Sequence, residues 1–167
     1  MIFATVGTQL PFDRLLTALD DWASTHPEVR VMAQTGRTDG TFAHMECAEN
    51  LGQTEFTTAF EAARVIVAHA GMGSILSASE LGKPILLMPR RAALGEHRND
   101  HQLDTAAEMA SLPNVTVVQD GKDLASALDR LLGQRDCAVA GSAKASALLI
   151  ANLQNFIFAS VALEMRG

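Results

Sequence analysis

Short apolar runs alternate with segments of helical periodicity along most of the chain. We expect strands at Ile2–Val6, Val29–Gln34, Phe42–Cys47, Arg64–Ala68, Ile85–Met88 and Val115–Val118. The predicted helices contain Leu15–Trp22, Phe56–Ala63, Ser74–Leu81, Asp100–Met109 and Leu124–Leu132. Strands that are apolar throughout and alternate with helices are typical of a parallel sheet covered on both faces. Because crossovers between parallel strands are right-handed, the sequence predicts one doubly wound, Rossmann-like α/β domain over residues 1–167.

The composition argues against some functions. The 167 residues carry a formal net charge of −6, and no basic cluster is larger than the pair Arg90-Arg91. Binding to nucleic acid phosphates requires a field of cations, so we expect no nucleic-acid partner. The two cysteines, Cys47 and Cys137, lie far apart without C-x-x-C spacing, which favours reduced thiols in a cytosolic protein.

The segment Ala145–Leu163 contains no charged residue. Its length approaches that of a membrane span, but the amides of Asn152, Gln154 and Asn155 at its centre would be costly in hydrocarbon. The segment instead predicts a final helix over residues 143–163, with apolar residues around more of its surface than one core stripe uses. We expect this helix either to pack fully on the domain or to dock partly on a partner.

Three loops follow predicted strands at the edge of the sheet where ligands bind. In an open parallel sheet, ligands bind outside the carboxyl ends of the strands, where the strand order reverses. The loops Gly7–Asp13, His69–Ser74 and Pro89–Gln102 all follow such carboxyl ends. We therefore expect the functional site to combine these loops, with Thr8 and Gln9 facing a ligand.

The turn His69–Ser74 joins a buried strand to a helix. Glycines let backbone N–H groups approach an anion, and the helix N-terminus adds partial positive charge, so Gly71 and Gly73 predict a phosphate site. We expect Ser74 either to cap the helix or to donate its hydroxyl to phosphate. The alternative is a tight turn with an ordinary cap and no ligand. A dinucleotide fingerprint fits poorly, because Leu76 occupies its third glycine position.

The loop Pro89–Gln102 is the most charged loop of the chain. Arg90 and Arg91, beside a helix N-terminus, are suited to clamp a diphosphate or a sugar carboxylate with bidentate geometry. The neutral donors for sugar and ribose hydroxyls in this loop are Asn99, His101 and Gln102. The alternative is a solvated loop in which a helix begins at Asn99 or Asp100.

His97 and His101 stand four residues apart, the spacing of two metal ligands on a helix. Residue 98 is arginine instead of the glutamate of H-E-x-x-H, and the sequence offers no third ligand, so we expect no metal. A serine nucleophile is also disfavoured, because the sequence has no G-x-S-x-G elbow.

In combination, these segments resemble the C-terminal domain of glycosyltransferase family 28. The resemblance covers about residues 1–132 and rests on Thr5–Thr8 with Phe12-Asp13, His69–Ser74, Gly82–Ile85 and Asn99–Gln102. It is greatest for the stand-alone, Alg13-like subunits, and Met88–Gln102 resembles their bacterial exopolysaccharide branch, PssE. This implies the C-terminal half of a GT-B glycosyltransferase divided between two chains, with a UDP-sugar as substrate and no cofactor.

The resemblance also implies a role in exopolysaccharide or glycolipid synthesis. This chain would bind a UDP-sugar carrying glucuronate or N-acetylglucosamine, and a membrane-anchored Alg14- or PssD-like subunit would bind the lipid-linked acceptor. The chain would lie in the cytoplasm, peripheral to the inner face of the membrane through its partner. The alternative is a non-catalytic regulatory module that binds a nucleotide sugar.

The residues and the resemblance together predict a donor site at the carboxyl edge of the sheet. The expected donor-binding residues are Gly7, Thr8, His69, Gly71, Met72, Gly73, Ser74, Arg90, Arg91, Asn99, His101 and Gln102. Ser77 stands where relatives often place a ribose-binding glutamate, and the nearest acid is Glu80. The catalytic base is expected on the partner, with His69 and His97 as the candidates in this chain.

Overall fold

The computed structural model describes residues 1–133. The strands are β1 (Ile2–Thr5), β2 (Val31–Gln34), β3 (Glu46–Ala48), β4 (Val65–His69), β5 (Ile85–Met88) and β6 (Val115–Val117). The helices are α1 (Asp13–Ser24), α2 (Gln53–Ala62), α3 (Met72–Glu80), α4 (His101–Met109) and α5 (Gly121–Gly133), with a short 3-10 turn, η1 (Ala92–Leu94). The predicted helix over residues 143–163 lies outside the described residues. Within residues 1–133, no helix is long and apolar enough to cross a membrane.

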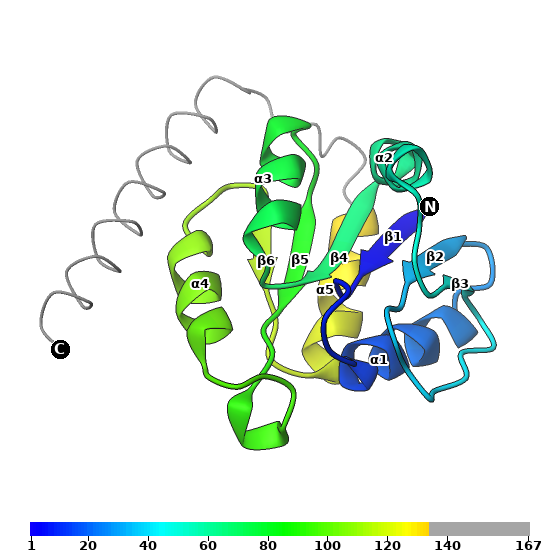
Figure 1. Cartoon of the computed structure of the whole chain (residues 1–167). Coiled ribbons are helices and arrows are strands. Elements are labelled where there is room, and N and C mark those ends of the chain that lie inside the picture. Colours follow the sequence, from blue (N-terminus) through cyan, green and yellow to red (C-terminus); the bar gives the residue numbers. More distant parts are fainter. Residues whose placement is uncertain (134–167) are drawn as a thin grey trace, which may run out of the picture.

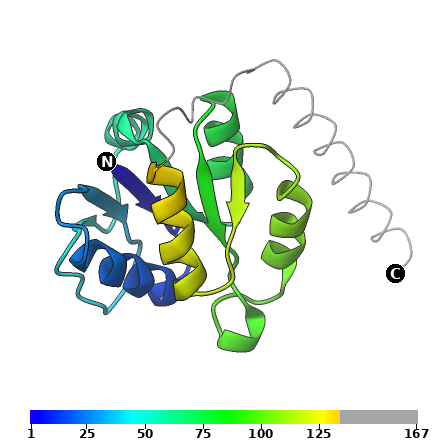
Figure 2. The ribbon, with the colours of Figure 1, turned by 180° about the vertical axis from the view of Figure 1, so that it is seen from behind.

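The described strands form one parallel sheet in the order β3-β2-β1-β4-β5-β6. The predicted doubly wound, Rossmann-like fold is confirmed, and the strand order reverses between β1 and β4. Helices α1 and α5 cover one face, and α2, α3 and α4 cover the other (Figures 1 and 2). The carboxyl ends of β1 and β4 therefore lie side by side at the expected binding edge.

Both faces of the central strands are buried, which explains why their sequences are apolar throughout. In β1, Ile2 and Ala4 point into the core beneath α1 and α5, whereas Phe3 points into the opposite core. The Phe3 ring packs edge-on against Phe56 and Phe60 of α2, with ring centroids 5.3 and 6.1 Å apart. These two cores hold the strand ends that carry the site.

The structure corrects the sequence prediction at the third strand and at the start of α3. The third strand is Glu46–Ala48 instead of Phe42–Cys47, because Phe42 packs against the core beneath α1 and only the following residues pair with β2. Helix α3 begins at Met72 with Gly71 as its N-cap, so the predicted capping role of Ser74 is wrong. The residue before α1 is Phe12, and no side chain caps that helix.

Candidate functional site

A cavity of about 550 Å³ opens at the carboxyl ends of β1, β4 and β5. Its lining comprises Val6, Gly7, Thr8, Gln9, Leu10, His69, Gly73, Arg90, His97 and Gln102. All three predicted loops contribute to it, as expected for a ligand site at the switch in strand order. A larger groove of about 910 Å³ is lined mainly by side chains of α1 and α5 and lies away from these strand ends.

Two segments that reach this cavity carry backbone N–H groups for which no acceptor lies within residues 1–133. The first set belongs to the opening turn of α3, Met72–Ser74, where Ile75 is the first residue to donate within the helix and no side chain caps the end. The second set belongs to Thr8–Leu10 in the loop after β1. Unpaired N–H groups at a helix N-terminus attract anions. Gly73 of the first set lines the cavity, as do all three residues of the second set.

The ring of His69 lies between two glycines at the base of the site. A Cβ atom on Gly7, which has φ +76°, would lie 3.0 Å from His69 Cε1, and a Cβ on Gly71 would collide with His69 Nε2. By contrast, a Cβ on Gly73 would meet nothing within 4 Å. Gly7 and Gly71 therefore accommodate the His69 ring, whereas Gly73 keeps the space outside the helix N-terminus open.

His69 is neutral at physiological pH. Burial and, to a smaller extent, the nearby Arg90 cation lower its pKa to about 4, although a hydrogen bond with the backbone of Thr5 opposes these effects. Its Nδ1 atom is buried without a hydrogen-bond partner in the described structure. A base with so low a pKa accepts protons weakly at pH 7, which makes His69 a poor general base.

Arg90 lies at the base of the cavity, and its terminal N–H groups bond to protein carbonyls. The guanidinium donates to the carbonyl oxygens of Val6 (2.8 Å), Leu10 (2.7 Å), Pro11 (2.5 Å) and Glu96 (3.2 Å). It also stacks on the Phe12 ring, 4.6 Å from the centroid. These contacts occupy both terminal nitrogens. Arg90 could therefore clamp a diphosphate, as the sequence predicted, only if these hydrogen bonds broke.

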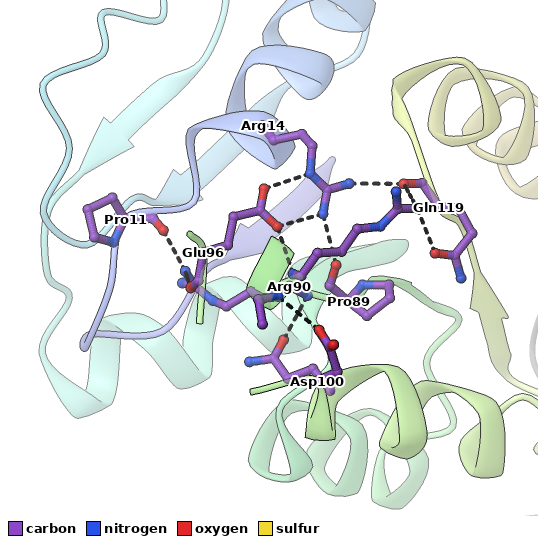
Figure 3. Close-up of polar contacts among 10 residues, drawn as sticks. Pro11, Arg14, Pro89, Arg90, Glu96, Asp100 and Gln119 are labelled. Atoms are coloured by element: carbon purple, nitrogen blue, oxygen red, sulfur yellow. Dashed lines mark hydrogen bonds and ion pairs between the residues drawn. The ribbon is translucent and has the colours of Figure 1, made fainter. Parts of the chain in front are cut away.

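The loop Pro89–Gln102 is tied to the domain by a second set of polar contacts (Figure 3). Glu96 forms a two-pronged ion pair with Arg14 of α1, with N–O distances of 2.7 and 2.8 Å, and accepts the Arg91 N–H. Burial acts to raise the pKa of Glu96, but Arg14 and the Arg91 N–H outweigh it and lower that pKa. The charged loop is therefore anchored to the domain by these contacts. The alternative of a solvated loop did not predict such anchoring.

The remaining predicted residues divide between the cavity and its surroundings. Gln102 lines the cavity, and its Oε1 accepts a hydrogen bond from the backbone N–H of Arg90. Its amide N–H₂ group takes no part in that bond. The Arg91 guanidinium bonds to Gln119, and His101 is exposed at the start of α4. The other predicted residues outside the cavity lining are Gly71, Met72, Ser74, Asn99, Ser77 and Glu80. Their roles in binding stay predictions.

His97 precedes α4, so it does not share a helix with His101, and the two rings are not a pair of ligands on one helical face. His97 lines the cavity, and its Nδ1 lies 3.0 Å from Asn99 Oδ1 and 3.2 Å from Asn99 O. The Asn99 backbone N–H also donates to Nδ1 at 3.5 Å, so the described hydrogen-bond contacts of this ring all involve Nδ1, and Nε2 has no partner within residues 1–133. Within this chain, the geometry favours His97 over His69 as a base.

Two important contacts were not identified from the sequence. Leu10 lines the cavity and its carbonyl oxygen accepts from Arg90, a contact that no residue pattern specifies. The Arg14–Glu96 pair joins residues 82 positions apart, so no local signal connects them. Glu96, in the same loop as Arg90 and Arg91, was the one sign in the sequence that this loop makes internal ion pairs.

Gly71→Ala is expected to destabilise the domain by roughly 1–3 kcal/mol, because the new Cβ displaces the His69 ring from a packed site. In the His69→Ala background the same change should cost less than about 0.5 kcal/mol, since contacting residues couple in a double-mutant cycle. Urea denaturation of the four proteins measures the coupling. Equal costs of Gly71→Ala in both backgrounds would contradict the packing described above.

The fold and the cavity together define a Rossmann-like domain with a cavity at its switch point. The sequence matches the glycosyltransferase family 28 C-terminal domain over residues 1–154, and the chain belongs to that family. Its fold is that of the C-terminal half of a GT-B glycosyltransferase. A comparison with curated protein sequences finds no significant match.

Solved structures share this fold at low sequence identity. The glycotransferase of kitacinnamycin is 20% identical with a TM-score of 0.64, and the match covers 90% of this chain but 39% of that protein. ALG13 is 17% identical with a TM-score of 0.58, covering 80% of this chain and 86% of ALG13. The UDP-GlcNAc 2-epimerase of Neisseria meningitidis, bound to UDP-GlcNAc, is 12% identical with a TM-score of 0.59, covering 92% and 43%. This chain thus spans less than half of the first and third proteins.

Proposed function

We propose that this chain is the donor-binding half of a two-component glycosyltransferase, which transfers a sugar from a UDP-sugar to a lipid-linked acceptor. The observation that carries the proposal is a cavity lined by Gly73, in the first turn of α3, and by Thr8–Leu10, two segments whose backbone N–H groups have no acceptor within residues 1–133. The leaving diphosphate gains negative charge as the glycosidic bond breaks, and donors fixed in advance stabilise that charge. Membership of family 28 supports this reaction class.

Within this proposal, the first turn of α3 holds the donor's diphosphate, with Gly73 as the point of closest approach. The cavity residues Thr8 and Gln102 supply side-chain donors to the nucleotide sugar. Arg90 and Arg91 already bond within the protein, and this reduces the support for glucuronate as the sugar. N-acetylglucosamine is the competing sugar, and Ser77 and Glu80 are the candidates for ribose contact.

The transfer we propose is inverting and metal-independent, and it needs a base for the acceptor hydroxyl. His97 lines the cavity and has a free Nε2, so it is the candidate in this chain. The other source is the partner, an Alg14- or PssD-like membrane-anchored subunit that binds the acceptor. Residues 143–163 are proposed to dock on that subunit, which would hold this chain at the inner face of the membrane.

Isothermal titration calorimetry with UDP, UDP-glucuronate, UDP-N-acetylglucosamine and NAD tests the proposal. We expect UDP and one UDP-sugar to bind and NAD to show no binding, since the third glycine position of a dinucleotide site is Leu76. Transfer should require co-expression with the partner. No heat of UDP binding at millimolar ligand, alone or with the partner, would contradict the proposal. Binding without transfer by the assembled pair would favour the regulatory module.

A further inference from the structure

We propose that Arg90 is a positioning residue, which shapes the loop Val6–Phe12 for anion binding without contacting the anion itself. The inference rests on the proposed function, because it assigns a role in binding the donor's diphosphate. It differs from the expectation that this arginine clamps the diphosphate directly. The contacts of the guanidinium, its burial and the arrangement of neighbouring charges carry the argument.

The guanidinium gathers the carbonyl oxygens of one short loop. Val6 O and Leu10 O accept from Nη2, at 2.8 and 2.7 Å, and Pro11 O accepts from Nη1. Because these carbonyls are turned toward Arg90, the loop is folded around the cation. The N–H groups of Thr8–Leu10, in the middle of the same loop, have no acceptor within residues 1–133 and border the cavity. Arg90 thereby fixes the conformation in which those donors are available.

Arg90 also joins this loop to the second loop of the site. Arg90 follows the carboxyl end of β5. Its Nη1 also donates to Glu96 O at 3.2 Å. Its backbone N–H donates to Gln102 Oε1 at 3.1 Å, which orients a cavity side chain. One residue therefore sets the relative position of the loop after β1, the loop after β5 and the start of α4.

The positive charge of Arg90 is not cancelled by a bonded carboxylate. Only 3% of the residue is exposed, yet all its described hydrogen-bond acceptors are carbonyl oxygens. The Glu96 carboxylate is near enough to stabilise the Arg90 charge through space, but its hydrogen bonds go to Arg14 and to the Arg91 N–H (Figure 3). A buried charge without a bonded counterion is costly, and an anion in the adjacent cavity would offset that cost. The cation therefore favours an anionic ligand even without touching it.

Arginine suits this role better than lysine. Two terminal nitrogens in a rigid plane supply four N–H groups, and here all four meet a carbonyl oxygen. A lysine ammonium has three donors on one atom and cannot reach four carbonyls spread around a plane. Arg90→Lys consequently keeps the charge but loosens the loop, whereas Arg90→Met removes both.

Calorimetric titration with UDP and with inorganic pyrophosphate, well below the melting temperature of each variant, tests the role of Arg90. We expect Arg90→Met to weaken both ligands by at least about 30-fold, and Arg90→Lys by at least about fivefold, because loop preorganisation is lost. Arg64→Met is the matched control, since that guanidinium bonds to the Leu132 carbonyl oxygen and Arg64 precedes the amino end of β4, outside the cavity lining, so the affinity should stay within about twofold of the wild type. The NMR titration of His69 adds a second readout, because removing the Arg90 cation should raise the His69 pKa.

If Arg90→Met does not fold, Arg90→Lys decides the matter. A variant that melts at a lower temperature but binds UDP and pyrophosphate as tightly as the wild type would show a purely structural role and overturn the inference. If Arg90→Lys kept most of the wild-type affinity, the role assigned to Arg90 in shaping the loop Val6–Phe12 would be overturned. Failure of the wild-type protein to bind either ligand would instead contradict the proposed function.

Discussion

Gly73→Val is expected to weaken UDP binding by at least about 100-fold. The substitution places a branched side chain where the proposed function has the donor's diphosphate approach the first turn of α3, and a Cβ atom at this position faces open space. Two lost hydrogen bonds to a charged group cost roughly 3–6 kcal/mol. Because about 2.7 kcal/mol corresponds to a 100-fold change in affinity, the loss should be measurable by calorimetry.

The same substitution should leave the stability of the domain nearly unchanged. Gly73 is exposed in α3, so valine meets no protein atom within 4 Å. Glycine costs about 1 kcal/mol in a helix relative to alanine, and valine costs about 0.7 kcal/mol or less, so the two effects nearly cancel. A loss of binding with an unchanged melting temperature therefore reports on the ligand and not on folding.

Gly133→Val provides a matched control for this experiment. Gly133 also lies in a helix with no atom within 4 Å of a built Cβ, but it is at the end of α5 and outside the cavity lining. Its valine variant should bind UDP as the wild type does. Wild-type affinity of a folded Gly73→Val protein would show that phosphate does not bind at the N-terminus of α3, whatever the fate of the other site residues.

The parallel sheet could be predicted because burial on both faces leaves a direct trace in the sequence. Each central strand is a continuous apolar run, as in Ile85–Met88, and the turn residues Gly82 and Pro84 mark its start. The third strand was misplaced for the opposite reason. Glu46–Ala48 is a short edge strand with exposed residues, and the apolar Phe42 that marked the predicted strand packs outside the sheet.

The elements of the site were predicted, but the contacts within it were not. The rule that ligands bind at the switch in strand order brought the three loops together, because it depends on topology alone. The bonds of Arg90 could not be predicted in the same way. Its acceptors are the carbonyls of Val6, Leu10 and Pro11, about 80 positions earlier, and a backbone carbonyl leaves no mark on residue identity.

The second large effect that we expect is a loss of stability between pH 6.5 and pH 4, caused by His69. The pKa of this histidine is about 4 in the folded protein, against 6.5 for the free side chain, so the unfolded chain binds the proton more readily. The stability that depends on neutral His69 is then fully present above pH 6.5 and is lost as the pH falls toward 4. A difference of this size corresponds to about 3 kcal/mol in the free energy of unfolding.

Urea denaturation at several pH values, for the wild type and for His69→Gln, measures this contribution. Glutamine does not titrate, so the free energy of unfolding of the variant should decline much less between pH 6.5 and 4 than that of the wild type. Glu96 is the main competing group, but its lowered pKa places its contribution below about pH 4.3, at the acid end of the range. His101→Gln, which removes an exposed histidine, controls for the loss of an imidazole as such.

Titration of the His69 ring by NMR gives the pKa directly, and a midpoint near 6.5 would contradict both the burial argument and the expected slope. A midpoint near 4 has a consequence for catalysis. At pH 7 the ring would then be neutral and too weak a base to take a proton from an acceptor hydroxyl at an appreciable rate. Its part in the site would be limited to packing between Gly7 and Gly71 and to one neutral N–H donor. The search for a base would move to His97 and to the partner subunit.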